Sequence, residues 1–368
     1  MNIIAYRNDD LGGRILNAYA SYLIANLCGG KLEFFWDANL IERSGKLSVQ
    51  LEKNPYKRRY AQEMKRCFPR LKFIGETQMN AVLDADHYVF VRNLQDLLEH
   101  KESGKTLILT GQLELLGEER DVESLRLNDF FGEEAPEMYE FLFNETGLSE
   151  ELVEKVDKLA SDLKLSHSVG MHVRRGDCML MKEMLLTGKR YGGFSDEEIE
   201  RGARKAIRYE DYTNAFHRFG PLNLFICSDS DDVKYVFESH YGQRYHSYDV
   251  RSYYRLNLFG VSKWQKVIRL LKFRGIRHGI EDAIIDMLLL AHCRYIVRGS
   301  SLLGKVSTML NNDFIEIEDN GVLVDNVWGT ENLRFKSRTA NRIPFSADLH
   351  QAPSSIAYPE STQRLSNM

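Results

Sequence analysis

The sequence predicts an α/β fold arranged as two domains. Short runs of β-branched and aromatic residues alternate with longer segments of helical period, which is the pattern of strand–helix units. The chain has 368 residues, more than one hydrophobic core usually supports. The strand–helix units fall into two sets. We therefore place an N-terminal α/β domain at 1–165, a second α/β domain at 166–330, and a partly disordered extension at 331–368, which is rich in polar residues.

The first domain is expected to begin with a strand, a glycine-containing turn and a helix, followed by further strands. β-branched and aromatic residues mark the strands, and apolar residues at helical spacing mark the helix. Another helix is expected to start near Ser149, which precedes two glutamates. The expected elements are a strand at 3–6, a turn at 10–14, a helix at 15–27 that ends before Gly29 and Gly30, and strands at 32–36, 88–91 and 106–109.

The second domain is predicted from three apolar runs and the helices between and after them. We expect strands at 168–173, 223–229 and 294–297, a helix at 281–290, and a helical run that ends at Leu310. Ligands bind at the carboxyl ends of strands in such sheets. With two domains, these ends are expected to face each other across a cleft. The residues that directly follow each strand are therefore the first candidates for a site.

The most informative stretch is His172-Val173-Arg174-Arg175-Gly176-Asp177, at the end of a strand. Two guanidinium groups on a rigid base suit the capture of a phosphate or pyrophosphate, because each planar fork makes paired charge-assisted hydrogen bonds. The alternative is that the arginines are surface charges and that Asp177 caps a helix.

Three further groups follow strands or lie on apolar helices. Asp286 lies on an otherwise apolar helix face, where a carboxylate is costly without a partner. That partner could be the N–H donors of a guanine edge or a neighbouring arginine. Ser300 and Ser301 lie at a helix N-terminus, where they could bind phosphate oxygens or simply cap the helix. Ser228 and Asp229 lie at the end of the strand at 223–229. Asp229 could hold an arginine in place or meet a substrate hydroxyl, or one of the two residues could simply cap the next helix.

Gly12 and Gly13 form the weakest of these candidates. Glycines before a helix let the backbone approach a ligand closely, and a helix N-terminus favours an anion. Their spacing is not that of a dinucleotide-binding or P-loop motif, so an ordinary turn explains them equally well.

Composition narrows the class of protein. The chain is 43% hydrophobic with a net charge of −4, which gives no reason to expect nucleic-acid binding. Its five cysteines show neither a disulfide framework nor zinc-ligand spacing, so we expect no metal site. Together with the lack of a signal-like N-terminus, they favour the cytoplasm. Residues 251–280 are basic without acids, which indicates a solvated face or a peripheral contact with an anionic acceptor or membrane headgroups.

These motifs together resemble the GDP-fucose-dependent fucosyltransferase superfamily, which includes the bacterial nodulation α1,6, the α1,2 and the protein O-fucosyltransferases. The family signature H-x-R-R-x-D is similar to His172–Asp177, and the (T/S)-D-D-like turn is similar to Ser228–Ser230. The family's Asp on an apolar helix, followed by a strand ending in Ser-Ser, looks like Asp286 and Ser300-Ser301. The match in order and spacing covers 168–310, and Ser230 departs from it because the family has a second acid there.

The resemblance implies a GT-B architecture of two Rossmann-like domains and an inverting transfer of L-fucose from GDP-fucose to a carbohydrate acceptor, without a cofactor or a required metal. It implies that Arg174 contacts the β-phosphate with help from Arg175, and that Asp286 and the His172 backbone read guanine. Ser300 and Ser301 would meet the pyrophosphate, and the turn at Gly12 and Gly13 would line the donor. Asp177 and Glu183 remain as candidate catalytic carboxylates, although Glu183 lies one residue beyond the position of a candidate base in some relatives.

Two other functions fit the same residues. A transferase of this shape could use another GDP-sugar such as GDP-mannose, because the guanine and pyrophosphate contacts would be unchanged. A non-catalytic module could bind GDP or a sugar without turnover.

Overall fold

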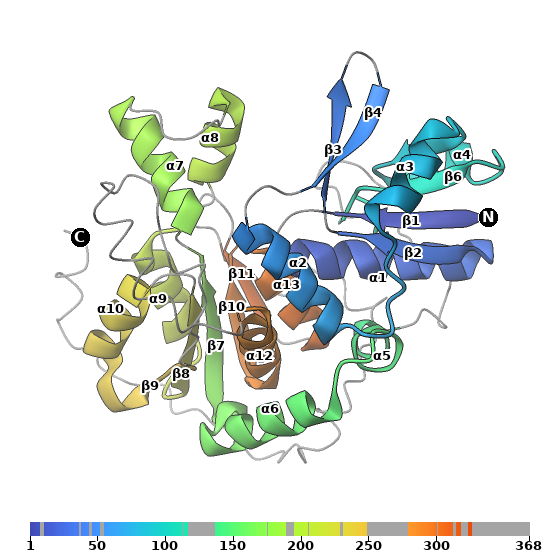
Figure 1. Ribbon diagram of the computed structural model, residues 1–368. Coiled ribbons are helices and arrows are strands. Elements are labelled where there is room, and N and C mark those ends of the chain that lie inside the picture. The colour runs from blue at the N-terminus through green and yellow to red at the C-terminus, as the bar shows by residue number, and fades with distance from the viewer. Residues whose placement is uncertain are drawn as a thin grey trace.

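The chain folds into two mainly parallel β-sheets with helices packed between and around them (Figure 1). The predicted α/β class and the presence of two sheets are therefore confirmed. That their carboxyl edges face each other across a cleft stays a prediction. The structure is a computed structural model and describes residues 1–7, 11–36, 38–43, 46–51, 55–112, 114–116, 137–174, 176–188, 195–204, 206–228, 231–248, 279–299, 301–311, 314–317 and 323–325.

The first sheet has the strand order β2-β1-β6-β5, and all its pairs are parallel. The predicted strands are confirmed to within one residue at each end. An antiparallel hairpin, β3–β4, was not predicted, because its polar residues interrupt the apolar pattern. The strands are β1 Asn2–Tyr6, β2 Lys31–Phe35, β3 Ala38–Arg43, β4 Lys46–Leu51, β5 Tyr88–Val91 and β6 Thr106–Leu109.

Helix α1, Leu11–Cys28, covers one face of this sheet, and its start corrects the predicted turn. Gly12 and Gly13 lie in the first turn of the helix instead of in a loop before it. Glycine has low helix propensity, but packing overrides it here, because Gly12 lies against the backbone of Leu302 and Leu303. The predicted end is confirmed, since Gly29 follows the helix with a φ of 58°.

The other face of the first sheet packs against the hairpin and α3, through Met79 and Leu83. Ser149 caps α6 as predicted, with its side chain accepting a hydrogen bond from the Leu152 amide. The remaining helices of this part of the chain are α2 Pro55–Cys67, α3 Glu76–Asp84, α4 Leu94–His100, α5 Met138–Glu140 and α6 Glu150–Asp162.

The second sheet has the order β12-β11-β10-β7-β8-β9, with β7 between β10 and β8. Its pairs are parallel except for β11–β12. The three predicted strands and the helix that ends at Leu310 are confirmed. The strands are β7 Ser168–Val173, β8 Asn223–Ser228, β9 Tyr245–His246, β10 Tyr295–Arg298, β11 Phe314–Ile317 and β12 Leu323–Asp325, and the helices are α7 Gly176–Thr187, α8 Asp196–Arg204, α9 Tyr209–His217, α10 Asp231–Tyr241, α12 Gly279–His292 and α13 Leu302–Leu310.

Alternate residues of β7 face two different helix layers. Val169, Met171 and Val173 belong to a core cluster with residues of α9 and α10. Gly170 faces the end of α12, since a Cβ there would lie 3.0 Å from Leu290 Cδ2 and 2.8 Å from Sγ of Cys293, which follows the helix. This alternation sends His172 to the same side as Gly170, toward α12 and α13.

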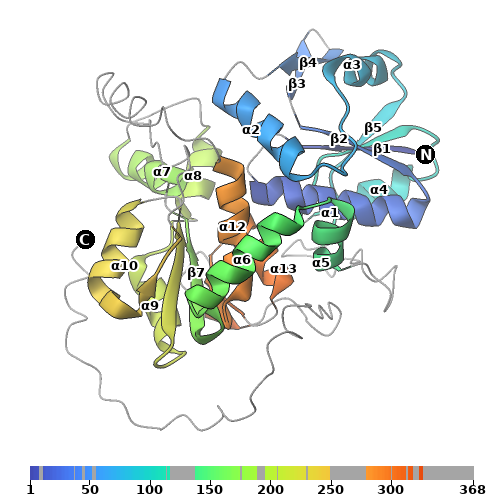
Figure 2. The ribbon, with the colours of Figure 1, turned by 60° about the horizontal axis from the view of Figure 1, so that its bottom comes forward.

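Helices α1, α12 and α13 lie between the two sheets and share one core with both (Figure 2). Polar contacts also join the two parts, because Glu63 of α2 accepts a hydrogen bond from the Ile280 amide at the start of α12. None of the helices within the described ranges is long and apolar enough to cross a membrane. Residues 251–278, which carry most of the predicted basic contact surface, and the extension at 331–368 lie outside the described residues.

Candidate functional site

His172 lies near the end of the central strand β7 and is 6% exposed. Its register partners are Cys227 on β8 and Arg298 on β10. Burial above all, together with the charges of Arg174 and Arg298, lowers the pKa of His172 to about 3. His172 is therefore neutral at physiological pH. Its Nδ1 atom is buried and makes no hydrogen bond to the part of the chain that the structure describes.

Arg174 and Arg298 lie close enough to His172 for their guanidinium charges to lower its pKa. Arg174 directly follows β7 and is half-buried. Arg298 ends β10, is 2% exposed and lies over the Phe314 ring at 5.5 Å. Sequence reasoning did not select Arg298. The sequence pattern could have indicated it, because Arg298 directly follows a predicted strand just before Ser300 and Ser301, and Arg174 was selected for a similar position after β7.

Helix α13 begins at the same edge of the sheet. Ser301 is its N-cap, with the side chain accepting a hydrogen bond from the Gly304 amide at 3.4 Å. Gly304 lets the helix approach closely, since a Cβ there would lie 3.2 Å from the Cβ of Arg298 and 3.4 Å from that of His172. The positive end of the helix therefore lies beside the two arginines.

Asp286 is buried on α12 as predicted, at 5% exposure among apolar neighbours. Its main-chain oxygen accepts a hydrogen bond from the Cys227 thiol at 3.4 Å. After burial, the carboxylate of Asp286 is the next cause that raises the pKa of Cys227, while Lys234 lowers it. Asp286 thus lies beside β8, next to the strand that carries His172.

Ser228 ends β8 and is buried. Its hydroxyl donates a hydrogen bond to the Val173 carbonyl at 2.7 Å, across the β7–β8 pair. This contact fixes the backbone directly before Arg174. The structure therefore gives Ser228 a positioning contact, and its predicted contact with the donor stays a prediction.

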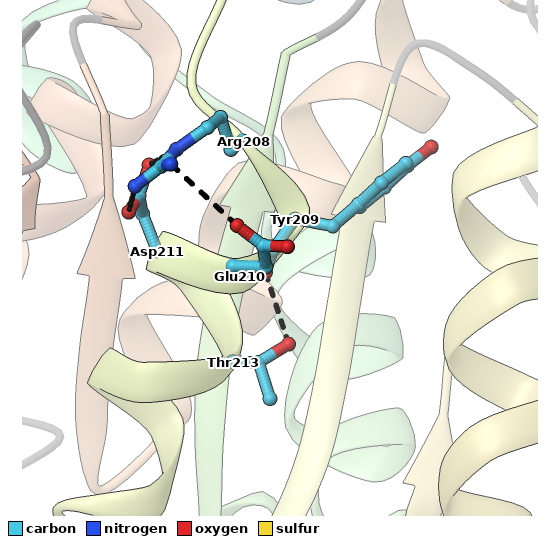
Figure 3. A network of polar contacts seen from close by, with 5 residues as sticks. All are labelled: Arg208, Tyr209, Glu210, Asp211 and Thr213. Carbon is cyan, nitrogen blue, oxygen red and sulfur yellow. Dashed lines mark hydrogen bonds and ion pairs between the residues drawn. The ribbon is translucent and has the colours of Figure 1, made fainter. Parts of the chain in front are cut away.

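The start of α9 packs against the turn after β10. A Cβ on Gly299 would meet the side chains of Ile207 and Tyr212. Just before α9, Arg208 donates two hydrogen bonds to Asp211, at 3.1 and 2.8 Å, and lies 3.6 Å from Glu210 (Figure 3). The Arg208 side chain is exposed, so this network orients the helix end and adds little to stability.

The remaining predicted site residues are not all described. Glu183 is exposed on α7, and its carbonyl accepts a hydrogen bond from the Thr187 hydroxyl at 2.8 Å. Asp177 lies in the first turn of α7, but its side chain is outside the described part of the structure. Arg175, Asp229 and Ser300 lie outside the described residues altogether.

The structure therefore gathers His172, Arg174, Arg298 and Ser301 at one edge of the second sheet, with Asp286 on the adjoining helix. This environment attracts an anion, because two arginines and a helix N-terminus surround a neutral histidine. A phosphate can accept hydrogen bonds both from a guanidinium group and from the amides of the helix N-terminus. Among the described residues, no group of three His, Cys, Asp or Glu side chains could hold a metal ion.

Comparison with protein-family models and with curated proteins found no match to this sequence. Among solved structures, the chain is similar to fucosyltransferase NodZ from Bradyrhizobium, with 16% identity, coverage of 88% of this chain and 98% of that chain, and a TM-score of 0.41. It is also similar to an Arabidopsis thaliana FUT1 mutant in complex with GDP (12% identity, 86% and 70% coverage, TM-score 0.38). A third similar structure is POFUT1 in complex with GDP (9% identity, 85% and 95% coverage, TM-score 0.41).

Proposed function

We propose that this protein is an inverting, metal-independent glycosyltransferase that moves L-fucose from GDP-fucose to a hydroxyl of a glycan or glycolipid-linked acceptor. The observation that carries the proposal is the pair Arg174 and Arg298 around neutral His172, at the N-terminus of α13. This arrangement occurs where the sequence resembles the H-x-R-R-x-D and Ser-Ser motifs of the fucosyltransferases.

The proposed reaction forms one bond and breaks one. The acceptor oxygen attacks the anomeric carbon of fucose, the bond from that carbon to the β-phosphate oxygen breaks, and the acceptor proton passes to a base. GDP leaves with an additional negative charge. Arg174 and Arg298 stabilise that charge from fixed positions, and such preorganised stabilisation is commonly the largest catalytic contribution. Asp177 and Glu183 are the candidate bases.

A nucleotide panel tests the guanine and pyrophosphate part of the proposal. We expect GDP and GDP-sugars to raise the melting temperature of the protein, and UDP, ADP and CMP to have little effect. A ligand present at about 100 times its Kd stabilises by roughly 2.7 kcal/mol, which a thermal shift resolves. Asp286→Ala should weaken GDP more than ADP if the carboxylate reads guanine. Equal loss for both nucleotides would make Asp286 a structural residue.

Arg174→Ala tests the chemistry. We expect the variant to fold and to lose roughly 10²–10³ in transfer rate, as on removal of one charge-stabilising donor. Arg201→Ala, at an exposed arginine of α8, is the matched control and should retain the rate. A folded Arg174→Ala enzyme with near wild-type activity would refute the proposal. Donor turnover with GDP-fucose and GDP-mannose identifies the sugar, and GDP binding without any turnover would indicate a non-catalytic module.

A further inference from the structure

A pocket of about 630 Å³ opens at the carboxyl edge of the first sheet, on elements that the site at His172 does not use. Residues that end or directly follow β1, β5 and β6 line it, together with the β3–β4 hairpin. Its volume is in the range of small-molecule binding sites, and its position at strand ends is where such sites occur in α/β sheets.

The charged residues that line the pocket give it a positive balance. Arg7 follows β1 and Arg92 follows β5, and both line the pocket together with a single carboxylate, that of Glu114. Among the described residues that line the pocket, two guanidinium groups therefore accompany one carboxylate. A guanidinium fork binds a carboxylate or phosphate through paired hydrogen bonds, which a lysine cannot reproduce.

Apolar and aromatic side chains complete the lining. Tyr6 and Phe90 belong to the sheet, and Leu40 and Leu47 come from the hairpin. The C–H face of a sugar ring packs on such surfaces, while its hydroxyls need polar partners at the edge. Glu114 can supply an acceptor there. The lining thus suits a pyranose with an anionic substituent better than a wholly neutral or wholly apolar ligand.

A side-chain hydrogen bond holds Arg7, and main-chain contacts hold the backbone at Arg92. Arg7 Nη1 donates to the Thr110 carbonyl at 2.6 Å. The Arg92 amide donates to the Asp96 carboxylate at 2.8 Å, and Gly111 packs so closely against the Arg92 carbonyl that no side chain would fit between them. A rigid lining binds a ligand with a smaller entropic cost than a mobile one.

The hairpin wall is also anchored. The Leu40 amide donates a hydrogen bond to the Tyr6 hydroxyl at 2.9 Å, and the Val49 amide donates one to Asn80 Oδ1 at 3.3 Å. The first bond ties β3 to the end of β1, and the second ties β4 to α3. The hairpin that lines the pocket is therefore attached to the first sheet and to α3.

Helix α1 connects this pocket to the site on the second sheet. Gly12 in its first turn contacts Leu302 and Leu303 at the start of α13. Asn17 donates hydrogen bonds to the carbonyls of Leu109 and Gly111, at 3.1 and 2.7 Å. Five residues of helix correspond to about 7.5 Å along its axis. The two sites are therefore held by the same few turns of one helix.

We propose that this pocket is the acceptor site and that its acceptor is a glycan bearing a carboxylate or a phosphate. The inference rests on the proposed function, because it names the acceptor of that transfer. Arg7 and Arg92 hold the anionic substituent, and the aromatic and aliphatic residues hold the ring.

Direct binding tests the inference without the donor. The wild-type protein is titrated with a trigalacturonate, with a sugar phosphate such as glucose 6-phosphate, and with neutral maltotriose, by calorimetry or saturation-transfer NMR. We expect at least one anionic probe to bind at least tenfold more tightly than maltotriose. Comparison of the two anionic arms tells which substituent the pocket accepts. Equal affinity for all three probes would overturn the inference.

Arg92→Gln locates the binding. Its side chain is exposed, and the main-chain bond to Asp96 does not require it, so the variant is expected to fold. We expect it to lose at least tenfold in affinity for the anionic probe, with Arg92→Lys between wild type and Arg92→Gln. Lys105→Gln removes an exposed charge before β6, at the opposite edge of the sheet, and should remain within twofold of wild type. Equal losses in Arg92→Gln and Lys105→Gln, or no loss in Arg92→Gln, would refute the site.

A GDP thermal shift on the same preparation separates this inference from the proposed function. Selective binding of an anionic probe without any GDP binding would refute the donor site and retain the pocket. GDP binding with no preference for anionic probes would refute the pocket's assignment alone.

Discussion

Gly12 in the first turn of α1 lies directly against the main chain of Leu303 in the first turn of α13, with no room for a methyl group between them. Helix α1 follows β1 of the first sheet, and α13 follows β10 of the second sheet. Helix α1 begins near the pocket on the first sheet, and α13 begins near His172. This contact sets how closely α1 approaches α13 between the two sheets. It also gives Gly12 a packing role, whereas its predicted contact with the donor stays a prediction.

Gly12→Ala should destabilise the protein by about 1–3 kcal/mol, because an added methyl group overpacks two backbones that cannot separate cheaply. Denaturant unfolding measures the change. Gly75→Ala is the control, since nothing lies within 4 Å of a Cβ there and its φ of −94° suits alanine. It should cost under about 1 kcal/mol, mostly as a weaker helix N-cap. Equal effects of the two substitutions would contradict the packing role of Gly12.

Substitution of Ser301 can separate capping from ligand binding. Ser301→Asn and Ser301→Asp both retain a side chain that caps α13, and the two residues have similar size. Only the aspartate adds a negative charge beside Arg174 and Arg298. We therefore expect Ser301→Asp to bind GDP at least tenfold more weakly than Ser301→Asn, by isothermal titration at equal stability. The same GDP affinity in both variants would leave Ser301 as a helix cap alone.

Arg298→Lys should weaken GDP at least tenfold, because a lysine keeps the charge but cannot form the paired hydrogen bonds of the guanidinium. Guanosine, which lacks the phosphates, should bind the variant and the wild type alike. Arg244→Lys is the matched control, since Arg244 bonds to the Leu222 carbonyl before β8, at the opposite edge of the sheet. Parallel losses for GDP and guanosine in Arg298→Lys would indicate a general change in the fold.

The pH dependence of stability should report the burial of His172. Its pKa falls to about 3 in the folded protein, from 6.5 in the unfolded chain. Between these values the unfolded chain binds a proton that the folded protein does not, so the unfolding free energy decreases as the pH falls below 6.5. The expected loss from this group is about 2 kcal/mol at pH 5 relative to pH 8.

His172→Gln removes this titration. Its unfolding free energy, from urea titrations at the two pH values, should fall less than that of the wild type by about 2 kcal/mol. An identical pH dependence in the two proteins would show that His172 is protonated as readily in the folded state as in the unfolded one.

The strands and the main helices could be predicted from local patterns, because buried parallel strands are continuous apolar runs and helices show a clear period. Thr106–Leu109 and Ser168–Val173 match their predicted bounds. Local patterns failed where tertiary contacts outweigh propensity. Two glycines at 12 and 13 indicate a turn by themselves, and only the nearby backbone of α13 makes a helical glycine favourable there.

The candidate site was predicted in the same partial way. His172, Arg174, Asp286 and Ser301 stood out because charged or polar residues follow or interrupt apolar elements, and the structure gathers these side chains around the same edge of one sheet. Arg298 was overlooked, because its importance depends on strand order. Only the placement of β10 beside β7 brings it next to His172.

The sequence by itself determined the α/β class, the positions of most elements, and the choice of strand ends as candidate sites, since these follow from local periodicity and from the cost of burying charge. Tertiary structure alone decided which strands are neighbours and how α1 meets α13. It also brought Arg7 and Arg92, which are 85 residues apart in the sequence, to the same pocket. Contacts between distant segments depend on chain topology and close packing, and no local pattern of residues encodes them.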